Sequence, residues 1–156
     1  VFGPQENHKG RMASVAYHLF HQLKNDRKMR LFKGIDGYGD GEQCRDFIYV
    51  KDVVKVNLFF LNNPDKSGIF NCGTGQSQTF NDLAKAAQKA MGFGELEYID
   101  FPEALKGKYQ NFTEADQAKL RQIGYTAAFT SLDDAVADYY RYLHQSGGYF
   151  TRENSQ

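Results

Sequence analysis

Residues 45–61 read RDFIYVKDVVKVNLFFL, and this stretch decides the fold class. Its segment Asp46–Val50 is a run of β-branched and aromatic residues, which is typical of a strand. Asp52 can then cap a helix over about Val53 to Leu61. That helix is apolar on most sides, so we expect it to be buried. A strand that passes directly into a helix favours an α/β architecture.

The same alternation continues toward the N-terminus. Apolar residues within 12–23 recur at helical spacing, and the helix should stop in the polar stretch Lys24–Lys28. Met29–Phe32 is then predicted to be extended. Gly34–Gly41 holds four glycines in eight residues, so we expect an exposed turn or loop there.

Three helices are predicted toward the C-terminus, each starting at a hydroxyl residue three positions before an acid. These capping residues are Thr79, Thr113 and Ser131. Short strands are expected at Ile69–Cys72 and Leu96–Ile99. Because no repeat or Pro/Ser-rich linker interrupts the chain, the sequence does not support two independent domains.

Composition excludes several classes of protein. The 156 residues carry 19 Lys+Arg against 19 Asp+Glu, which argues against a general nucleic-acid binder. Apolar runs are only a few residues long, too short to span a bilayer. Cys44 and Cys72 lack metal or redox spacing and favour a reducing cytoplasm. The chain opens on Val1 without an initiator Met, as expected of a processed start or a piece of a longer enzyme.

Neither a dinucleotide fingerprint nor a metal site is convincing. The two glycine-rich turns fail the GxGxxG pattern because Glu42 and Gln78 stand where the third glycine belongs. His18 and His21 lie one helical turn apart, but no further ligand at helical spacing completes a zinc site. We therefore interpret the two glycine-rich segments as structural turns. For the two histidines, a polar contact or a pocket-lining role is favoured over metal binding.

Two cations are candidates for chemistry. Lys9 lies just before the first predicted helix, near a positive helix end, which together with partial burial would suit acid–base work. Arg45 lies at a strand edge beside a glycine-rich loop and could bind a phosphate with two parallel hydrogen bonds. The alternatives are a solvated surface lysine and a surface salt bridge of little energetic value.

Several stretches together resemble the ADP-L-glycero-D-manno-heptose 6-epimerases of the extended short-chain dehydrogenase/reductase superfamily. They are VFGPxExHKGxMASVAxH at residues 1–18, RDFIYVxDV at 45–53, IFNxGTG at 69–75, KGxYQxFTxAD at 106–116 and LRxxGY at 120–125. The RDFIYVxDV motif is shared widely across the superfamily, whereas the HKG and KGxYQ stretches are narrower. The match corresponds to the C-terminal half of the family's protein, so the NADP loop and the Tyr-x-x-x-Lys pair are expected upstream.

The resemblance implies a fold and an activity. The fold is the C-terminal, substrate-binding part of an extended Rossmann-type enzyme. The family holds NADP and epimerises ADP-D-glycero-D-manno-heptose to ADP-L-glycero-D-manno-heptose at C6″, through oxidation to a 6-keto intermediate and re-reduction. The product serves the inner core of lipopolysaccharide in Gram-negative bacteria. A cytoplasmic homo-oligomer without nucleic-acid or membrane partners is implied.

Site residues are implied position by position. Lys9 would be an acid–base group beside the upstream tyrosine, and Lys9 and Val1 would contact the cofactor. Arg45 is the natural partner of the pyrophosphate. The residues that would line the ADP-heptose site are Arg11, His18, Phe32, Lys33, Gly34, Ile35, Arg45 and Tyr109.

The resemblance also divides the chain. Residues 1–39, 70–105 and 119–156 would form the substrate-binding lobe, and residues 40–69 and 106–118 would return to the NADP-binding domain. Without that domain we expect the chain to be poorly folded and inactive. Two alternatives remain: another sugar-nucleotide epimerase or dehydratase of the superfamily, acting on UDP- or dTDP-sugars, and a non-catalytic nucleotide-sugar-binding module.

Overall fold

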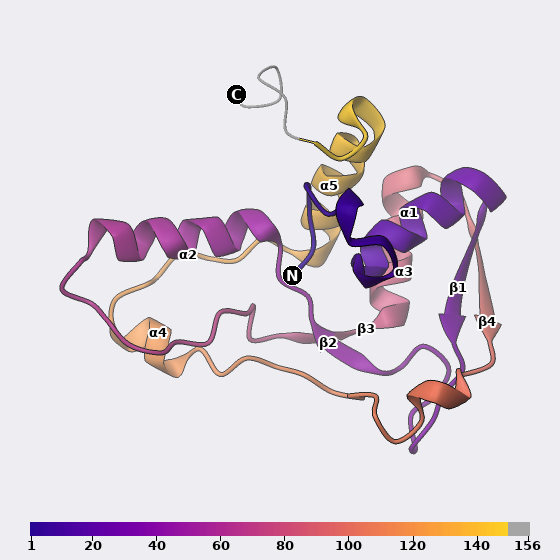
Figure 1. The fold of residues 1–156 in the computed structure, drawn as a ribbon, viewed down its shortest axis with the longest axis horizontal. Coiled ribbons are helices and arrows are strands. Elements are labelled where there is room, and N and C mark those ends of the chain that lie inside the picture. Colours follow the sequence, from indigo (N-terminus) through magenta and orange to yellow (C-terminus); the bar gives the residue numbers. More distant parts are fainter. Residues whose placement is uncertain (150–156) are drawn as a thin grey trace.

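Parallel pairing of two strands joined by helices confirms the α/β class. The computed structural model describes residues 1–149 (Figure 1). Its elements are η1 (Asn7–Met12), α1 (Val15–Asp26), β1 (Lys28–Phe32), β2 (Cys44–Asp46), α2 (Val50–Asn62), β3 (Ser77–Thr79), α3 (Phe80–Met91), β4 (Glu95–Ile99), η2 (Glu103–Leu105), α4 (Ala118–Gln122) and α5 (Leu132–Ser146). Strand β1 pairs in parallel with β4, and β2 pairs antiparallel with β3.

Helices α1, α3 and α5 pack together beside the β1–β4 pair and form the main core (Figure 1). The Phe20 ring on α1 meets the Tyr140 ring on α5 edge to face at 5.0 Å, and the Tyr140 hydroxyl donates to the carbonyl of Ala16 at 3.0 Å. Burial of each large apolar side chain stabilises the fold by about 1.5–3 kcal/mol. Among the buried members of this core are Phe2, Ala16, Leu19, Phe20, Leu23, Met29, Leu31, Tyr49, Phe80, Leu83, Ala87, Val136, Tyr139 and Tyr140.

Side-chain caps set the starts of these helices as the sequence predicts for α3 and α5. Thr79 and Asp82 form a capping box at α3, and Ser131 caps α5 by accepting from the amide of Asp134. Ser14 caps α1, which ends at Asp26 inside the predicted stretch. Two of the predicted extended segments are confirmed: Met29–Phe32 lies in β1, and Leu96–Ile99 lies in β4. The strand predicted at Ile69–Cys72 is wrong, because no strand forms there.

A small core lies apart from the main core, between α2 and α4 (Figure 1). Its buried members are Val56, Leu120 and Tyr125, with Phe59, Phe60, Cys72, Ile123 and Phe129 packed against them. The expectation that α2 is buried is wrong for this chain, since Val54, Leu58 and Leu61 are 48%, 50% and 73% exposed. This core is too small to cover both sides of α2. The division of the chain into two lobes stays a prediction.

Asp52 is buried, but it does not cap α2. The helix begins at Val50 with Tyr49 at the N-cap, so Asp52 lies in its first turn. Its carboxylate accepts from the amide of Thr130 at 2.8 Å, from the Thr130 hydroxyl at 3.0 Å and from Lys55 Nζ at 2.8 Å. Asp52 therefore joins α2 to the segment before α5.

The predicted helix start at Thr113 is also wrong. The Thr113 hydroxyl accepts from the amide of Asp46 at 3.3 Å, and α4 begins only at Ala118. Pairing across segments replaces the local cap. The strand predicted at Asp46–Val50 forms earlier in the chain, as β2, because residues 44–46 are the ones that pair with β3. On its other side, Cys44 exchanges backbone hydrogen bonds with Asn111 and Thr113. Within residues 1–149, none of the helices combines the length and the apolar character needed to cross a membrane.

Candidate functional site

Two adjoining cavities form a cleft beside α1. The aromatic pocket, about 330 Å³, lies between α1 and the β1–β4 pair, and the arginine pocket, about 320 Å³, lies beyond it. They share Val15, Phe80 and Tyr109, so one ligand could extend through both. The aromatic pocket is lined by Val15, His18, Leu19, Gln22, Arg30, Leu31, Phe32, Gly41, Gln43, Phe80, Ile99 and Tyr109; the arginine pocket by Val1, Phe2, Ser14, Val15, Ala16, Arg45, Asp46, Phe47, Phe80 and Tyr109.

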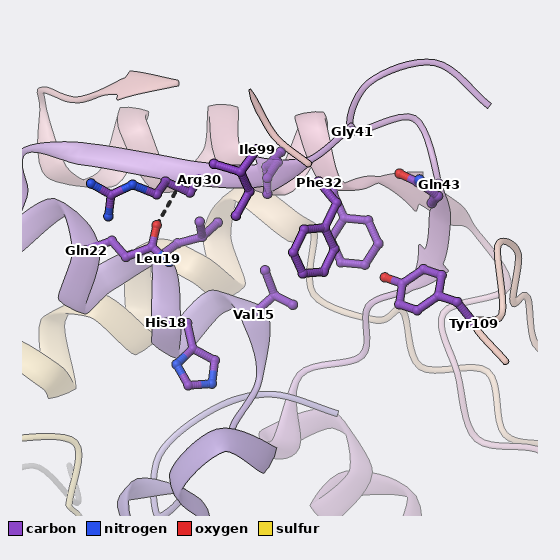
Figure 2. Close-up of a pocket in the computed structure, with 12 residues that line it drawn as sticks. Val15, His18, Leu19, Gln22, Arg30, Phe32, Gly41, Gln43, Ile99 and Tyr109 are labelled. Carbon is purple, nitrogen blue, oxygen red and sulfur yellow. Dashed lines mark hydrogen bonds between the residues drawn. The ribbon is translucent and has the colours of Figure 1, made fainter. Parts of the chain in front are cut away.

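The aromatic pocket has largely apolar walls with polar groups at its edges. Figure 2 shows Phe32 and Ile99 on one side, with His18 and Tyr109 at opposite ends of the cavity. Phe101 joins two of these walls, with its ring 5.2 Å from the ring of Phe32 and 5.2 Å from that of Tyr109. An apolar cavity with a few fixed polar groups suits a flat heterocycle.

Arg45 is the positive charge of the arginine pocket. Its guanidinium lies 4.8 Å from the centre of the Tyr109 ring and 5.7 Å from that of Phe80. One nitrogen, Nη1, donates to the carbonyl of Cys44 at 2.8 Å. Contact with ring faces holds the planar group in place without neutralising it.

No carboxylate of residues 1–149 forms an ion pair with Arg45. Arg30 of the aromatic pocket differs, because it pairs with Asp26 at 3.1 Å and with Glu97 at 3.4 Å. Burial raises the pKa of Tyr109, against the opposing effect of the Arg45 charge, so the phenol stays neutral. The arginine pocket is therefore suited to an anion.

The structure brings together several of the residues expected at the site. His18, Phe32 and Tyr109 line the aromatic pocket, and Arg45 and Tyr109 line the arginine pocket. Val1 lies at the edge of the arginine pocket and is 69% exposed. These five residues come from segments far apart in the sequence, so the fold itself creates their proximity.

The other expected residues line neither cavity. Lys33 is exposed and pairs with Asp100 at 2.7 Å, a hydrogen bond that raises the pKa of Lys33. Gly34, whose amide donates to Asp40 at 2.8 Å, and Ile35 belong to the loop that follows β1.

Lys9 and Arg11 lie on η1 with exposed side chains. The partial burial expected around Lys9 is therefore not supplied by residues 1–149. Its catalytic role, and the contacts of Arg11, stay predictions.

Lining residues that were not anticipated include Val15, Gln43, Phe80 and Ile99. Gln43 is 2% exposed, and its side-chain amide donates to the carbonyl of Lys33 at 3.4 Å. Period-two alternation in an extended segment could have placed Gln43 on the face of Arg45, two residues away. No sequence pattern indicated that Phe80 lines the cleft, because its position there depends on how α3 packs against the rest of the fold.

Comparisons with known proteins agree with this architecture. The model of the NAD dependent epimerase/dehydratase family matches residues 1–73. The chain is 52% identical to the ADP-L-glycero-D-manno-heptose-6-epimerase of Brachyspira hyodysenteriae, over 96% of this chain and 45% of the relative. It is 50% identical to the protein of the same name from Thiobacillus denitrificans, over 94% of this chain and 48% of the relative.

A solved structure gives the same result for the fold. The ADP-L-glycero-D-manno-heptose-6-epimerase of Helicobacter pylori has a TM-score of 0.77 at 25% identity, covering 92% of this chain and 42% of that one. The chain spans about half the length of the curated relatives it matches. Its fold is that of part of a Rossmann-type epimerase, and its residues 1–73 are similar to the NAD dependent epimerase/dehydratase family.

Proposed function

We propose that this chain is the sugar-nucleotide-binding part of an epimerase that converts ADP-D-glycero-D-manno-heptose to ADP-L-glycero-D-manno-heptose at C6″. The observation that carries the proposal is Arg45, a cation without an acidic partner among residues 1–149, at the cavity that adjoins an aromatic pocket. Identities of 52% and 50% to relatives with that name support the choice of reaction.

The cleft suggests how the substrate lies. The diphosphate binds Arg45, whose planar group can donate two parallel hydrogen bonds to phosphate oxygens. The nucleobase enters the aromatic pocket against Phe32 and Tyr109, where stacking and burial stabilise it. The sugar then extends past Arg45 toward Val1, at the edge of the arginine pocket. His18 lies at the end of the aromatic pocket opposite Tyr109 and would contact the nucleoside.

We place the nicotinamide cofactor at one edge of this chain, beside Val1. The stretches of residues 1–149 that are rich in glycine lack the GxGxxG pattern, so we expect a further part of the enzyme to bind the dinucleotide. When bound, the nicotinamide supplies the hydride acceptor and donor for C6″. Val1 would contact it from the open edge of the arginine pocket. We infer that the cofactor is NADP, from the same resemblance that names the substrate.

Proton transfer is the remaining task of the site. Inversion of a carbinol through a ketone needs a group that can take and return the hydroxyl proton of each epimer. We assign one of these roles to Lys9, whose exposed side chain on η1 is free to meet a sugar bound at the edge near Val1. A cytoplasmic homo-oligomer that supplies a lipopolysaccharide precursor is part of the same proposal.

A comparison of sugar nucleotides tests the proposal. Binding of ADP-, UDP- and dTDP-linked sugars to the full-length protein is measured by calorimetry, and epimerisation at C6″ is followed by NMR. We expect ADP-linked sugars to bind most tightly and ADP-heptose to be interconverted. Tighter binding of a UDP- or dTDP-sugar would contradict the proposed substrate and favour another sugar-nucleotide epimerase or dehydratase. Binding without turnover would favour a non-catalytic module.

A further inference from the structure

Asp46 forms an unusually complete set of hydrogen bonds beside the arginine pocket. Its Oδ1 accepts from the amide of Thr74 at 2.7 Å and from the Thr74 hydroxyl at 2.6 Å. Its Oδ2 accepts from the amides of Gly75 at 2.9 Å and Ala115 at 3.1 Å. One carboxylate thereby holds three segments together: β2, the turn after Cys72 and the segment before α4.

Close packing at Gly73 lets the turn approach this carboxylate. A Cβ at Gly73 would lie 2.5 Å from Asp46 Oδ2 and 2.5 Å from the Cβ of Ala115. The amide of Asp46 also donates to the Thr113 hydroxyl at 3.3 Å. Hydrogen bonds of both the main-chain amide and the side-chain carboxylate therefore hold Asp46 in its position in β2.

Arg45 precedes Asp46 in the same strand and reaches different partners. Neighbouring side chains of a strand point to opposite faces. The guanidinium accordingly lies over Tyr109 and Phe80, whereas the carboxylate meets amides and a hydroxyl. The negative charge of Asp46 is thus stabilised by these donors and forms no ion pair with Arg45.

We infer that Asp46 is a positioning residue for the anion-binding group of this cleft: it anchors the strand that carries Arg45 and keeps that guanidinium available to a phosphate. The inference rests on the proposed function in that it takes the diphosphate of the substrate as the anion. Asp46 itself need not touch the ligand. Its effect on affinity passes through Arg45.

Asp46→Asn tests this in the full-length protein, with ADP and adenosine as probes in calorimetry. The new amide nitrogen faces backbone donors, so the anchor loosens. We expect ADP affinity to fall about tenfold, the scale of one impaired charge-assisted hydrogen bond, with adenosine affinity unchanged. In an Arg45→Met background, the same substitution should change ADP affinity less than about twofold, because coupled residues are not additive.

The matched control is Asp52→Asn, which alters a buried carboxylate that also binds a main-chain amide and a hydroxyl but lines neither cavity. It should lower thermal stability without changing ADP affinity. Should Asp46→Asn not fold, Thr74→Val removes one donor to Asp46 while keeping the side-chain shape, and a smaller loss of ADP affinity is expected.

The outcomes separate the two proposals. If Asp46→Asn costs the same ADP affinity with Arg45 present as in the Arg45→Met background, or if it weakens ADP and adenosine equally, its role is general and structural, and the inference is overturned. Unchanged ADP affinity in both Asp46→Asn and Thr74→Val would overturn it as well, with the proposed function intact. If the unaltered protein binds no ADP, both proposals fail.

Discussion

Replacement of Arg45 by Met removes the charge of the arginine pocket while keeping a flexible side chain of similar reach. In the folded chain the guanidinium lies 4.8 Å from the Tyr109 ring centre and has one hydrogen bond, to the Cys44 carbonyl at 2.8 Å. Methionine can still pack on the aromatic rings, because its thioether is polarisable and adapts to irregular surfaces. The substitution therefore separates charge from packing.

The expected loss follows from the contacts that a diphosphate would make. A hydrogen bond to a charged group contributes about 1.5–3 kcal/mol, and about 1.4 kcal/mol is tenfold in affinity. ADP should thus bind Arg45→Met about 10- to 150-fold more weakly. Stability should fall by no more than about 2 kcal/mol, the upper range for a half-buried cation–π contact, because Met keeps part of the packing.

Calorimetry with ADP and adenosine measures the effect. Arg27→Met is the matched control, because Arg27 lies 4.1 Å from the Phe93 ring centre and lines neither cavity. Only Arg45→Met should weaken ADP, and neither variant should weaken adenosine. Unaltered ADP binding in Arg45→Met, or the same loss in both variants, would refute the assignment of the diphosphate to this cation.

Three further outcomes are expected. Lys9→Met should reduce turnover of ADP-heptose by about 10²–10⁴-fold with sugar-nucleotide affinity kept, and equal turnover in steady-state assays would remove Lys9 from the mechanism. Burial would raise the pKa of Asp138, but hydrogen bonds from Lys51 and Tyr49 outweigh it and lower the pKa overall. The stability from Asp138 is therefore present at neutral pH and lost as pH falls through the lowered pKa. Asp138→Asn should lower the melting temperature at pH 7, and its difference from the unaltered protein should shrink as the pH falls through the acid range; a constant difference in thermal scans would contradict this. Asp52→Ala should cost about 1–3 kcal/mol in denaturant unfolding, because it leaves the half-buried amide and hydroxyl of Thr130 without their acceptor.

Local signals predicted the elements whose ends are stabilised by their own neighbours. Thr79 and Ser131 cap the helices that follow them, and the cap bonds lie within three residues. Apolar spacing along α1 likewise marked the face that is buried against α3 and α5. Such elements need no knowledge of the rest of the fold.

Elements that depend on distant partners were predicted less well. Asp52 and Thr113 each have the residue type of a helix cap, but each bonds to a segment more than sixty residues away. Helix α2 is apolar on more sides than the small core covers. At the site, Arg45 was recognisable from its own surroundings in sequence, whereas Phe80 and Gln43 join the cleft only through tertiary packing.

The path of the chain between its two cores has a further consequence. Within residues 1–149 the polypeptide passes between the main core and the small core four times, in the stretches 50–56, 72–80, 109–120 and 129–132. Neither core is therefore built from one continuous fragment. A protease that nicks the molecule once, for example between Asn63 and Gly68, should leave two peptides that stay associated and separate only in denaturant.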